Sequence, residues 1–225
     1  MLAGGADAPI TFGVMKAWEA LRVLASGRGD PTRACRPFSR DREGLVVGEG
    51  AAVLLLEDYE RARARGARIY AEIVGYGTSA DAGHITDPSI EGPARALRAA
   101  LAEAEIAPEE VDYINAHGTA TKANDRIETE VIKLIFGAHA RRVAISSTKA
   151  VHGHAMGAAG AIEFVAALLA LRHGIIPPTA HYTEPDPECD LDYVPNCARE
   201  QPLRVVLSNS FAFGGINAVL VARRV

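Results

Sequence analysis

From residue 69 onward, segments with an apolar strand pattern alternate with segments of helical spacing. The expected strands are 70–79, 111–118, 142–150 and two apolar runs within 204–225 that are joined by a glycine turn. The expected helices are 93–104, 125–137 and 160–174. Pro93 stands near the first turn of one helix, and Gly174 closes another. This alternation predicts an α/β protein whose helices cover the faces of a sheet.

The first 68 residues have a different pattern. The opening MLAGGAD is typical of the end of a buried strand, and residues 13–26 have helical spacing. An arginine-rich polar loop follows, and the apolar run 53–56 predicts a fully buried strand. The stretch 59–68 predicts a helix. Its basic side chains face either water or an acidic partner, and they are Arg61, Arg63, Arg65 and Arg68.

Composition places the chain among ordinary globular proteins, with 225 residues, 48% apolar and 23% charged. The net charge of −4 gives no indication of nucleic-acid binding. Three cysteines at irregular spacing argue against a disulfide framework and are typical of a reducing cytosol. The start lacks the pattern of a signal peptide, and the apolar helix pattern at 162–171 is shorter than the roughly 20 residues that span a bilayer. We therefore expect a soluble cytoplasmic protein without a membrane segment.

Three polar, glycine-flanked loops follow the ends of predicted strands. They are NAHGTAT at 115–121, STKAVHGH at 147–154 and NSFAFGG at 209–215. In open α/β sheets, ligands bind beyond the strand ends. The three loops together therefore predict a functional site at one edge of the sheet.

Metal and nucleotide sites fit these loops poorly. A zinc site would use three histidines, namely His117, His152 and His154. The chain has no HExxH motif and no CxxC pair, and no nearby acid completes the set. The glycine spacing at 153, 157 and 160 is not GxGxxG, and the GxSxG motif of serine hydrolases is absent. We expect neither a metal nor a cofactor.

Carbonyl chemistry is the third interpretation. Two imidazoles can donate hydrogen bonds to a developing oxyanion or enolate, and a buried lysine can hold the local charge state. Lys149 follows a strand, where its long side chain can reach inward. Glu163 is the only acid in an apolar helix, so it either pairs with Lys149 or lies exposed on the outer helix face.

With these loops in view, the chain resembles the condensing enzymes of fatty-acid and polyketide synthesis, in particular the beta-ketoacyl-[acyl carrier protein] synthase II type. The motifs that carry the resemblance are AGGAD, RPFSRDREGLVVGEGAAVLLLE, NAHGTATKAND, SSTKAVHGHAMGAAGA and NSFAFGGIN. The resemblance implies a thiolase-like fold with layers in the order αβαβα. Residues 69–225 would form a complete C-terminal half, and residues 1–68 would be the end of a partly present N-terminal half.

The resemblance also implies a mechanism. In the family, a cysteine takes an acyl chain from its acyl carrier protein, and the enolate of a decarboxylating malonyl-carrier attacks that thioester. His117 and His154 match the two active-site histidines, Lys149 the supporting lysine and Glu163 its acidic partner. Phe213 matches the gating phenylalanine whose backbone N–H helps form the oxyanion hole. The expected partner is an acyl carrier protein, and the full-length enzyme is expected to be a homodimer.

The departure from the family concerns the nucleophile. None of the cysteines at 35, 189 and 197 matches the context of the nucleophilic cysteine, which in the family precedes AGGAD. We therefore expect the C-terminal portion of a synthase, inactive as an isolated chain. A non-catalytic, chain-length-factor type partner is the alternative. A thiolase would need a cysteine within 198–225, and none is present. His152 matches no assigned role.

Overall fold

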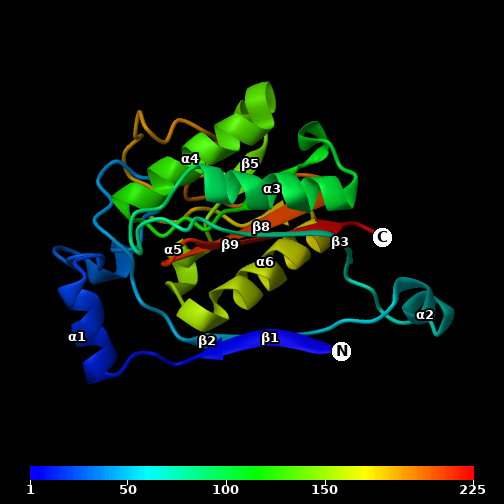
Figure 1. Ribbon diagram of the computed structural model, residues 1–225, viewed down its shortest axis with the longest axis horizontal. Coiled ribbons are helices and arrows are strands. Elements are labelled where there is room, and N and C mark those ends of the chain that lie inside the picture. The colour runs from blue at the N-terminus through cyan, green and yellow to red at the C-terminus, as the bar shows by residue number, and fades with distance from the viewer.

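A computed structural model describes residues 1–225, and its centre is a five-stranded mixed sheet (Figure 1). The strand order is β3-β9-β8-β4-β5. The pairs β3–β9 and β9–β8 are antiparallel, whereas β8–β4 and β4–β5 are parallel. The strands are β3 (Glu72–Ala80), β4 (Tyr113–Asn115), β5 (Ala144–Ser146), β8 (Val205–Ala212) and β9 (Ile216–Arg223). The sequence-based prediction of an α/β sheet protein is confirmed.

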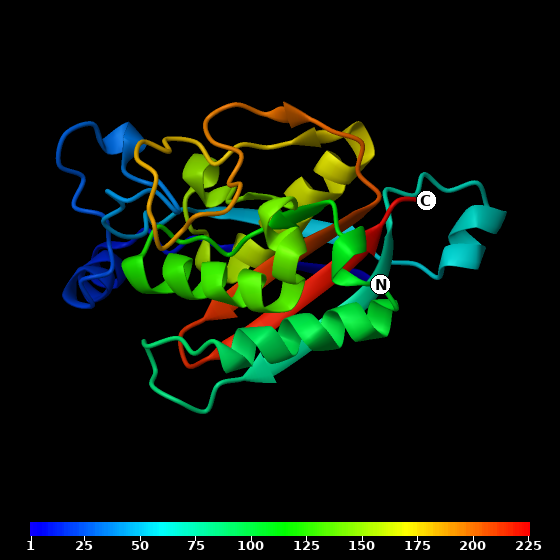
Figure 2. The ribbon, with the colours of Figure 1, turned by 90° about the horizontal axis from the view of Figure 1, so that it is seen from above.

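Two helices cover one face of this sheet, and Figure 2 shows them side by side over it. They are α3 (Glu91–Ala104) and α4 (Lys122–Phe136). The packing of α3 is close because small residues meet at the contact. A Cβ atom on Gly77 would stand 2.0 Å from the carbonyl oxygen of Ala96. Only glycine allows this approach of helix and strand backbones.

Helix α6 (Ala159–His173) lies on the opposite face, between the five-stranded sheet and a two-stranded sheet (Figure 1). This position explains its sequence, because a helix that packs on two sides is apolar around most of its circumference. By length and composition alone, the segment Met156–His173 could also cross a membrane. Its place between two sheets is that of a core helix.

The two-stranded sheet pairs β1 (Leu2–Asp7) with β2 (Gly50–Leu55) and forms the fourth layer. One face packs on α6, and the other faces solvent. The prediction of a fully buried strand here is wrong, because Val53 and Leu55 are 65% and 68% exposed. Leu2, paired with Leu55, is 72% exposed. Nothing in the chain covers the outer face, so a continuous apolar run is buried on one side only.

The remaining elements lie around these layers. The helix α1 (Phe12–Ala20) and the helix α2 (Tyr59–Ala64) lie at opposite ends of the molecule (Figure 1). The side chains of Arg61 and Arg65 are exposed and pair with Glu57, in agreement with a solvated helix. The expected strand 142–150 ends early, because α5 (Lys149–His152) follows β5. The short elements are β6 (Ile175–Ile176), β7 (Arg199–Glu200) and the 3-10 turns Pro31–Arg33, Pro108–Glu110, Gly137–Arg141 and Met156–Ala158.

Candidate active site

The three predicted loops converge on one cavity of about 590 Å³. His117 lies just beyond β4, His154 follows α5, and Phe213 occupies the turn between β8 and β9. All three line the cavity. Lys149 and Glu163 do not line it; they lie buried behind His117. The structure thus brings together all five residues selected from the sequence.

The two imidazoles lie edge to face in the cavity wall. Their ring centroids are 5.4 Å apart, with an angle of 84° between the ring planes. The backbone N–H of Met156 donates to Nδ1 of His154 over 3.1 Å. In the neutral ring, the proton of His154 therefore lies on Nε2. Nδ1 of His117 lies 3.3 Å from Nζ of Lys149, an obligate donor, so the proton of His117 also lies on Nε2.

Both imidazoles are held neutral. Burial, followed by the charge of Lys149, lowers the pKa of His154 to about 3. The same two causes, with His154 added, hold the pKa of His117 well below its ordinary value. At neutral pH the cavity therefore contains two N–H donors without a positive charge on either ring.

Lys149 makes three polar contacts inside the protein. Its Nζ lies 2.5 Å from Oε1 of Glu163 and 2.6 Å from the carbonyl oxygen of His117, in addition to Nδ1 of the same histidine. Glu163 is fully buried, so the alternative of an exposed position on the outer helix face is wrong. Burial raises the pKa of the Glu163 carboxyl to about 7, although Lys149 acts in the opposite direction. This pair fixes both the ring and the backbone of His117.

Glu128 is a supporting residue that the sequence analysis missed. From α4, its two carboxylate oxygens accept the backbone N–H groups of His117 and Gly118, each over 2.8 Å. Nδ2 of Asn209 donates to the same carboxylate over 3.1 Å. Gly118 has a φ of +37°, and a Cβ there would meet Ser147 at 2.5 Å. Glu128 therefore holds the two N–H groups of a turn in which only glycine fits at position 118.

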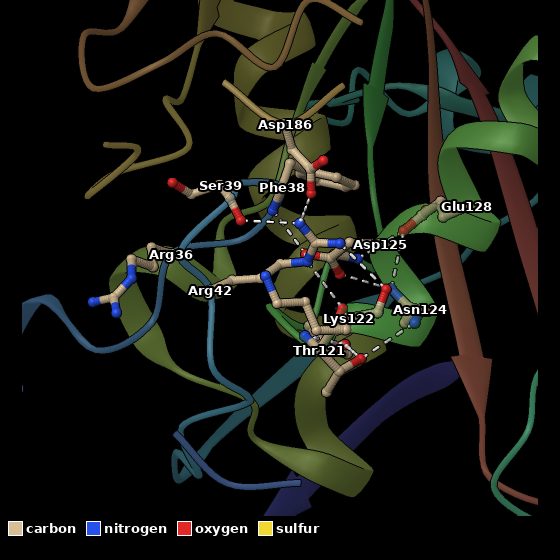
Figure 3. Close-up of polar contacts among 12 residues, drawn as sticks. Arg36, Phe38, Ser39, Arg42, Thr121, Lys122, Asn124, Asp125, Glu128 and Asp186 are labelled. Atoms are coloured by element: carbon tan, nitrogen blue, oxygen red, sulfur yellow. Dashed lines mark hydrogen bonds and ion pairs between the residues drawn. The ribbon is translucent and has the colours of Figure 1, made fainter. Parts of the chain in front are cut away.

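A buried arginine connects the arginine-rich loop to the same region (Figure 3). Arg42 pairs with Asp186, and its Nε lies 3.5 Å from Asp125. Its guanidinium also donates to the carbonyl oxygen of Thr121 over 3.2 Å. Asp125 accepts the backbone N–H of Phe38 over 2.7 Å. The loop thus buttresses the segment that carries His117.

Phe213 lies at the cavity mouth. Its side chain is 42% exposed and stacks on Trp18, with ring centroids 5.7 Å apart. Its backbone N–H donates to no acceptor within the chain. The next residue, Gly214, donates to the carbonyl oxygen of Ile85 over 2.7 Å. The turn therefore offers one free N–H group beside a partly exposed aromatic ring.

None of the three thiols lies in the cavity lining. Cys35 is buried and donates to the carbonyl oxygen of Lys149 over 3.1 Å, and burial raises the pKa of its thiol to about 12. Burial also raises the pKa of Cys189 to about 11. Cys197 is exposed. The two buried thiols therefore have raised pKa values, and the exposed thiol of Cys197 lies outside the cavity lining.

Comparison with known proteins agrees with the fold and the motifs. The C-terminal domain of the beta-ketoacyl synthase family matches residues 70–183, and its N-terminal domain matches residues 1–62. The chain is 59% identical over 225 residues to Nodulation protein E of Rhizobium sp. (strain N33), with 100% of the chain and 54% of that protein covered. It is 49% identical over 227 residues to 3-oxoacyl-[acyl-carrier-protein] synthase 2 of Coxiella burnetii, with 100% and 55% covered.

A solved ketosynthase, bound to a hexaketide and in complex with its type II polyketide synthase acyl carrier protein, superposes with a TM-score of 0.97. The sequence identity is 42%, and the match covers 100% of this chain and 56% of that chain. The chain spans about half the length of the curated relatives it matches. Its fold is the thiolase-like fold of ketosynthases. The chain belongs to the beta-ketoacyl synthase family.

Proposed function

We propose that this chain supplies the decarboxylating part of a 3-oxoacyl-[acyl carrier protein] synthase active site. His117 and His154 each donate an Nε2–H to the thioester oxygen of a malonyl unit bound to its carrier. The observation that carries the proposal is the pair of contacts at the two Nδ1 atoms, with Lys149 Nζ beside His117 and the Met156 N–H beside His154. Because both Nδ1 atoms face donors, both N–H groups are left for a ligand in the cavity.

The reaction follows from this arrangement. The bond between the malonyl methylene carbon and its carboxylate breaks, carbon dioxide leaves, and the electron pair forms an enolate. The two imidazoles stabilise the negative enolate oxygen, each such donor contributing roughly 3 kcal/mol in the transition state. The enolate carbon then attacks the acyl thioester on the nucleophilic cysteine. A carbon–carbon bond forms, and the thiolate of that cysteine leaves.

Lys149 and Glu163 maintain the state in which the histidines work. The ammonium of Lys149 beside Nδ1 disfavours a second proton on His117, so that ring donates as a neutral imidazole. Glu163 compensates the buried charge of Lys149. The free backbone N–H of Phe213 is suited to the oxyanion of the second step, and its ring to gating the cavity mouth.

The nucleophilic thiol belongs, in this proposal, to a segment other than these 225 residues. The burial and raised pKa values of Cys35 and Cys189, and the position of Cys197 away from the cavity, support this assignment. We assign residues 1–68 to the end of the N-terminal half and 69–225 to the C-terminal half. We use "assembled enzyme" for this chain together with the segment that supplies the nucleophile.

The carrier of both substrates is an acyl carrier protein. The solved relative that was captured with such a carrier supports this partner. The relatives named 3-oxoacyl-[acyl-carrier-protein] synthase 2 support fatty-acid or polyketide synthesis as the pathway class. We further propose a cytoplasmic location and a homodimeric assembled enzyme.

The test supplies the assembled enzyme with malonyl-carrier and an acyl-carrier and measures carbon dioxide and the 3-oxoacyl product. We expect both, and we expect His117→Ala to lower both about a hundredfold or more. His173→Ala, on the exposed end of α6, is the matched control and leaves both unchanged. An assembled enzyme that loads acyl groups but releases no carbon dioxide would indicate the non-catalytic partner instead.

A further inference from the structure

His152 hydrogen-bonds through both ring nitrogens, although it does not line the cavity. Its Nδ1 lies 2.8 Å from the carbonyl oxygen of Gly153, and its Nε2 lies 3.1 Å from Oγ1 of Thr148. A carbonyl oxygen only accepts, so Nδ1 carries the proton. Burial lowers the pKa of His152, which keeps the ring neutral and leaves Nε2 to accept from the Thr148 hydroxyl. His152 is thus the opposite tautomer of His117 and His154.

The first of these bonds fixes the peptide that precedes His154. The Gly153 carbonyl and the His154 N–H belong to one peptide plane. His152 holds its oxygen, and the carbonyl oxygen of Val46 accepts its N–H over 2.7 Å. Gly153 has a φ of +71°, in a region that glycine enters freely and leaves as freely. Bonds at both ends hold this plane, and the plane sets where the Cα atom of His154 lies and from which direction its ring enters the cavity wall.

The second bond reaches the segment that carries His117. Thr148 stands at the N-cap position of the four-residue helix α5, which is too short to be stable by its own hydrogen bonds. Oγ1 of Thr148 also accepts from Nδ2 of Asn115 over 3.4 Å. Asn115 ends β4, two residues before His117. One imidazole therefore connects both ends of α5 with the end of β4.

We propose that His152 is a positioning residue, which orients His154 for decarboxylation through the Gly153–His154 peptide and holds α5 against β4 through Thr148. The inference rests on the proposed function for its kinetic consequence. The tautomer and the orientation of the His152 and His154 rings can be measured whether or not the proposed function is correct.

Substitutions separate the two bonds. In His152→Asn the side-chain amide nitrogen takes the place of Nδ1 and keeps the donor to Gly153. In His152→Gln the amide oxygen takes the place of Nε2 and keeps only the contact with Thr148. We expect Ala and Gln to lower kcat of malonyl decarboxylation by roughly tenfold to a hundredfold, with KM and acyl loading little changed, since small displacements of a catalytic group have such effects. Asn restores most of the rate, and His173→Ala is the control.

The second readout is the ¹⁵N shift pattern of the histidine rings in the assembled enzyme. We expect His152 as the Nδ1–H tautomer and His154 as the Nε2–H tautomer. In the Ala and Gln variants, the Nδ1 signal of His154 should move toward the value of a ring that exchanges between tautomers. If the Ala variant does not fold, the comparison of Asn with Gln decides.

The positioning role would be overturned by an Nε2–H tautomer for His152, or by an unchanged His154 signal and rate in both Ala and Gln. Equal rates in Asn and Gln would also contradict it, because the bond to Gly153 would then have no part. The unsubstituted enzyme could release no carbon dioxide while the His154 signal still responds to the substitutions as expected. This pair of results would contradict the proposed function and support the positioning of His154 by His152.

Discussion

Lys149 and Glu163 face each other inside the protein, with 2.5 Å between Nζ and Oε1 and neither side chain reaching water. Removing one partner of such a pair leaves an uncompensated buried charge, which costs about 3–5 kcal/mol. We expect Lys149→Met and Glu163→Gln each to destabilise the protein by this amount. The double variant should lose less than the sum of the two.

The measurement is a double-mutant cycle from denaturant unfolding at about pH 8, above the raised pKa of Glu163, so that the carboxylate is ionised. Lys16 and Glu19, an ion pair with both side chains exposed, offer a control cycle with little coupling. Strict additivity at positions 149 and 163 would refute the pairing.

The pKa of His154 predicts a pH dependence of stability. The folded protein binds a proton at His154 with a pKa of about 3, whereas the ordinary value is 6.5. Between these values the unfolded chain holds more protons, so this histidine's contribution to stability falls as the pH falls from 6.5 toward 3. The slope approaches about 1.4 kcal/mol per pH unit.

His154→Asn isolates this effect, because the amide oxygen can still accept the Met156 N–H and does not titrate. On acidification below about pH 6.5, the unfolding free energy of the unsubstituted protein should fall relative to that of this variant. Parallel stability curves for the two proteins would mean that His154 titrates normally in the fold.

The outer face of the β1–β2 sheet predicts the behaviour of the isolated chain. Val53 and Leu55 are exposed there, whereas the neighbouring Leu54 packs toward α6. Exposed apolar patches promote association. We expect Val53→Thr with Leu55→Thr to reduce light scattering by the isolated chain without lowering its stability. Leu54→Thr should lower the stability, and equal effects of the two changes would contradict the one-sided burial.

The pairing of Glu163 was foreseeable from the sequence, whereas the role of Glu128 was not. Glu163 stands alone in the apolar run AIEFVAALLAL, so a buried position requires a partner. Glu128 stands among other charged residues in DRIETEVIK, a pattern that equally fits a solvated helix face. Only the packing of α4 beside the end of β4 brings its carboxylate to two backbone N–H groups.

The error at 53–56 has a similar origin. A continuous apolar run indicates a strand, but it does not say whether one or both faces are covered. The α/β alternation, the helix end at Gly174 and the hairpin in the tail depend on local signals, and the sequence predicted them correctly. Helix α5 was missed because four residues are too few for a helical period.

The isolated chain should form no condensation product. A thioester is attacked by a thiolate, and the raised pKa values of Cys35 and Cys189 keep both thiols protonated at neutral pH. The measurement is intact-mass analysis of residues 1–225 after incubation with acyl-carrier and malonyl-carrier. A stable acyl adduct on any of the three cysteines, or a 3-oxoacyl product, would contradict this expectation.

The central claim is that the two imidazoles act on the malonyl unit and not on the acyl transfer. In the assembled enzyme, His154→Ala tests it most directly, with acyl loading and release of carbon dioxide from malonyl-carrier measured on the same preparation. The account predicts that decarboxylation falls on the order of a hundredfold or more while loading remains close to that of the unsubstituted enzyme. An equal loss of both steps, or unchanged decarboxylation, would contradict the role assigned to His154.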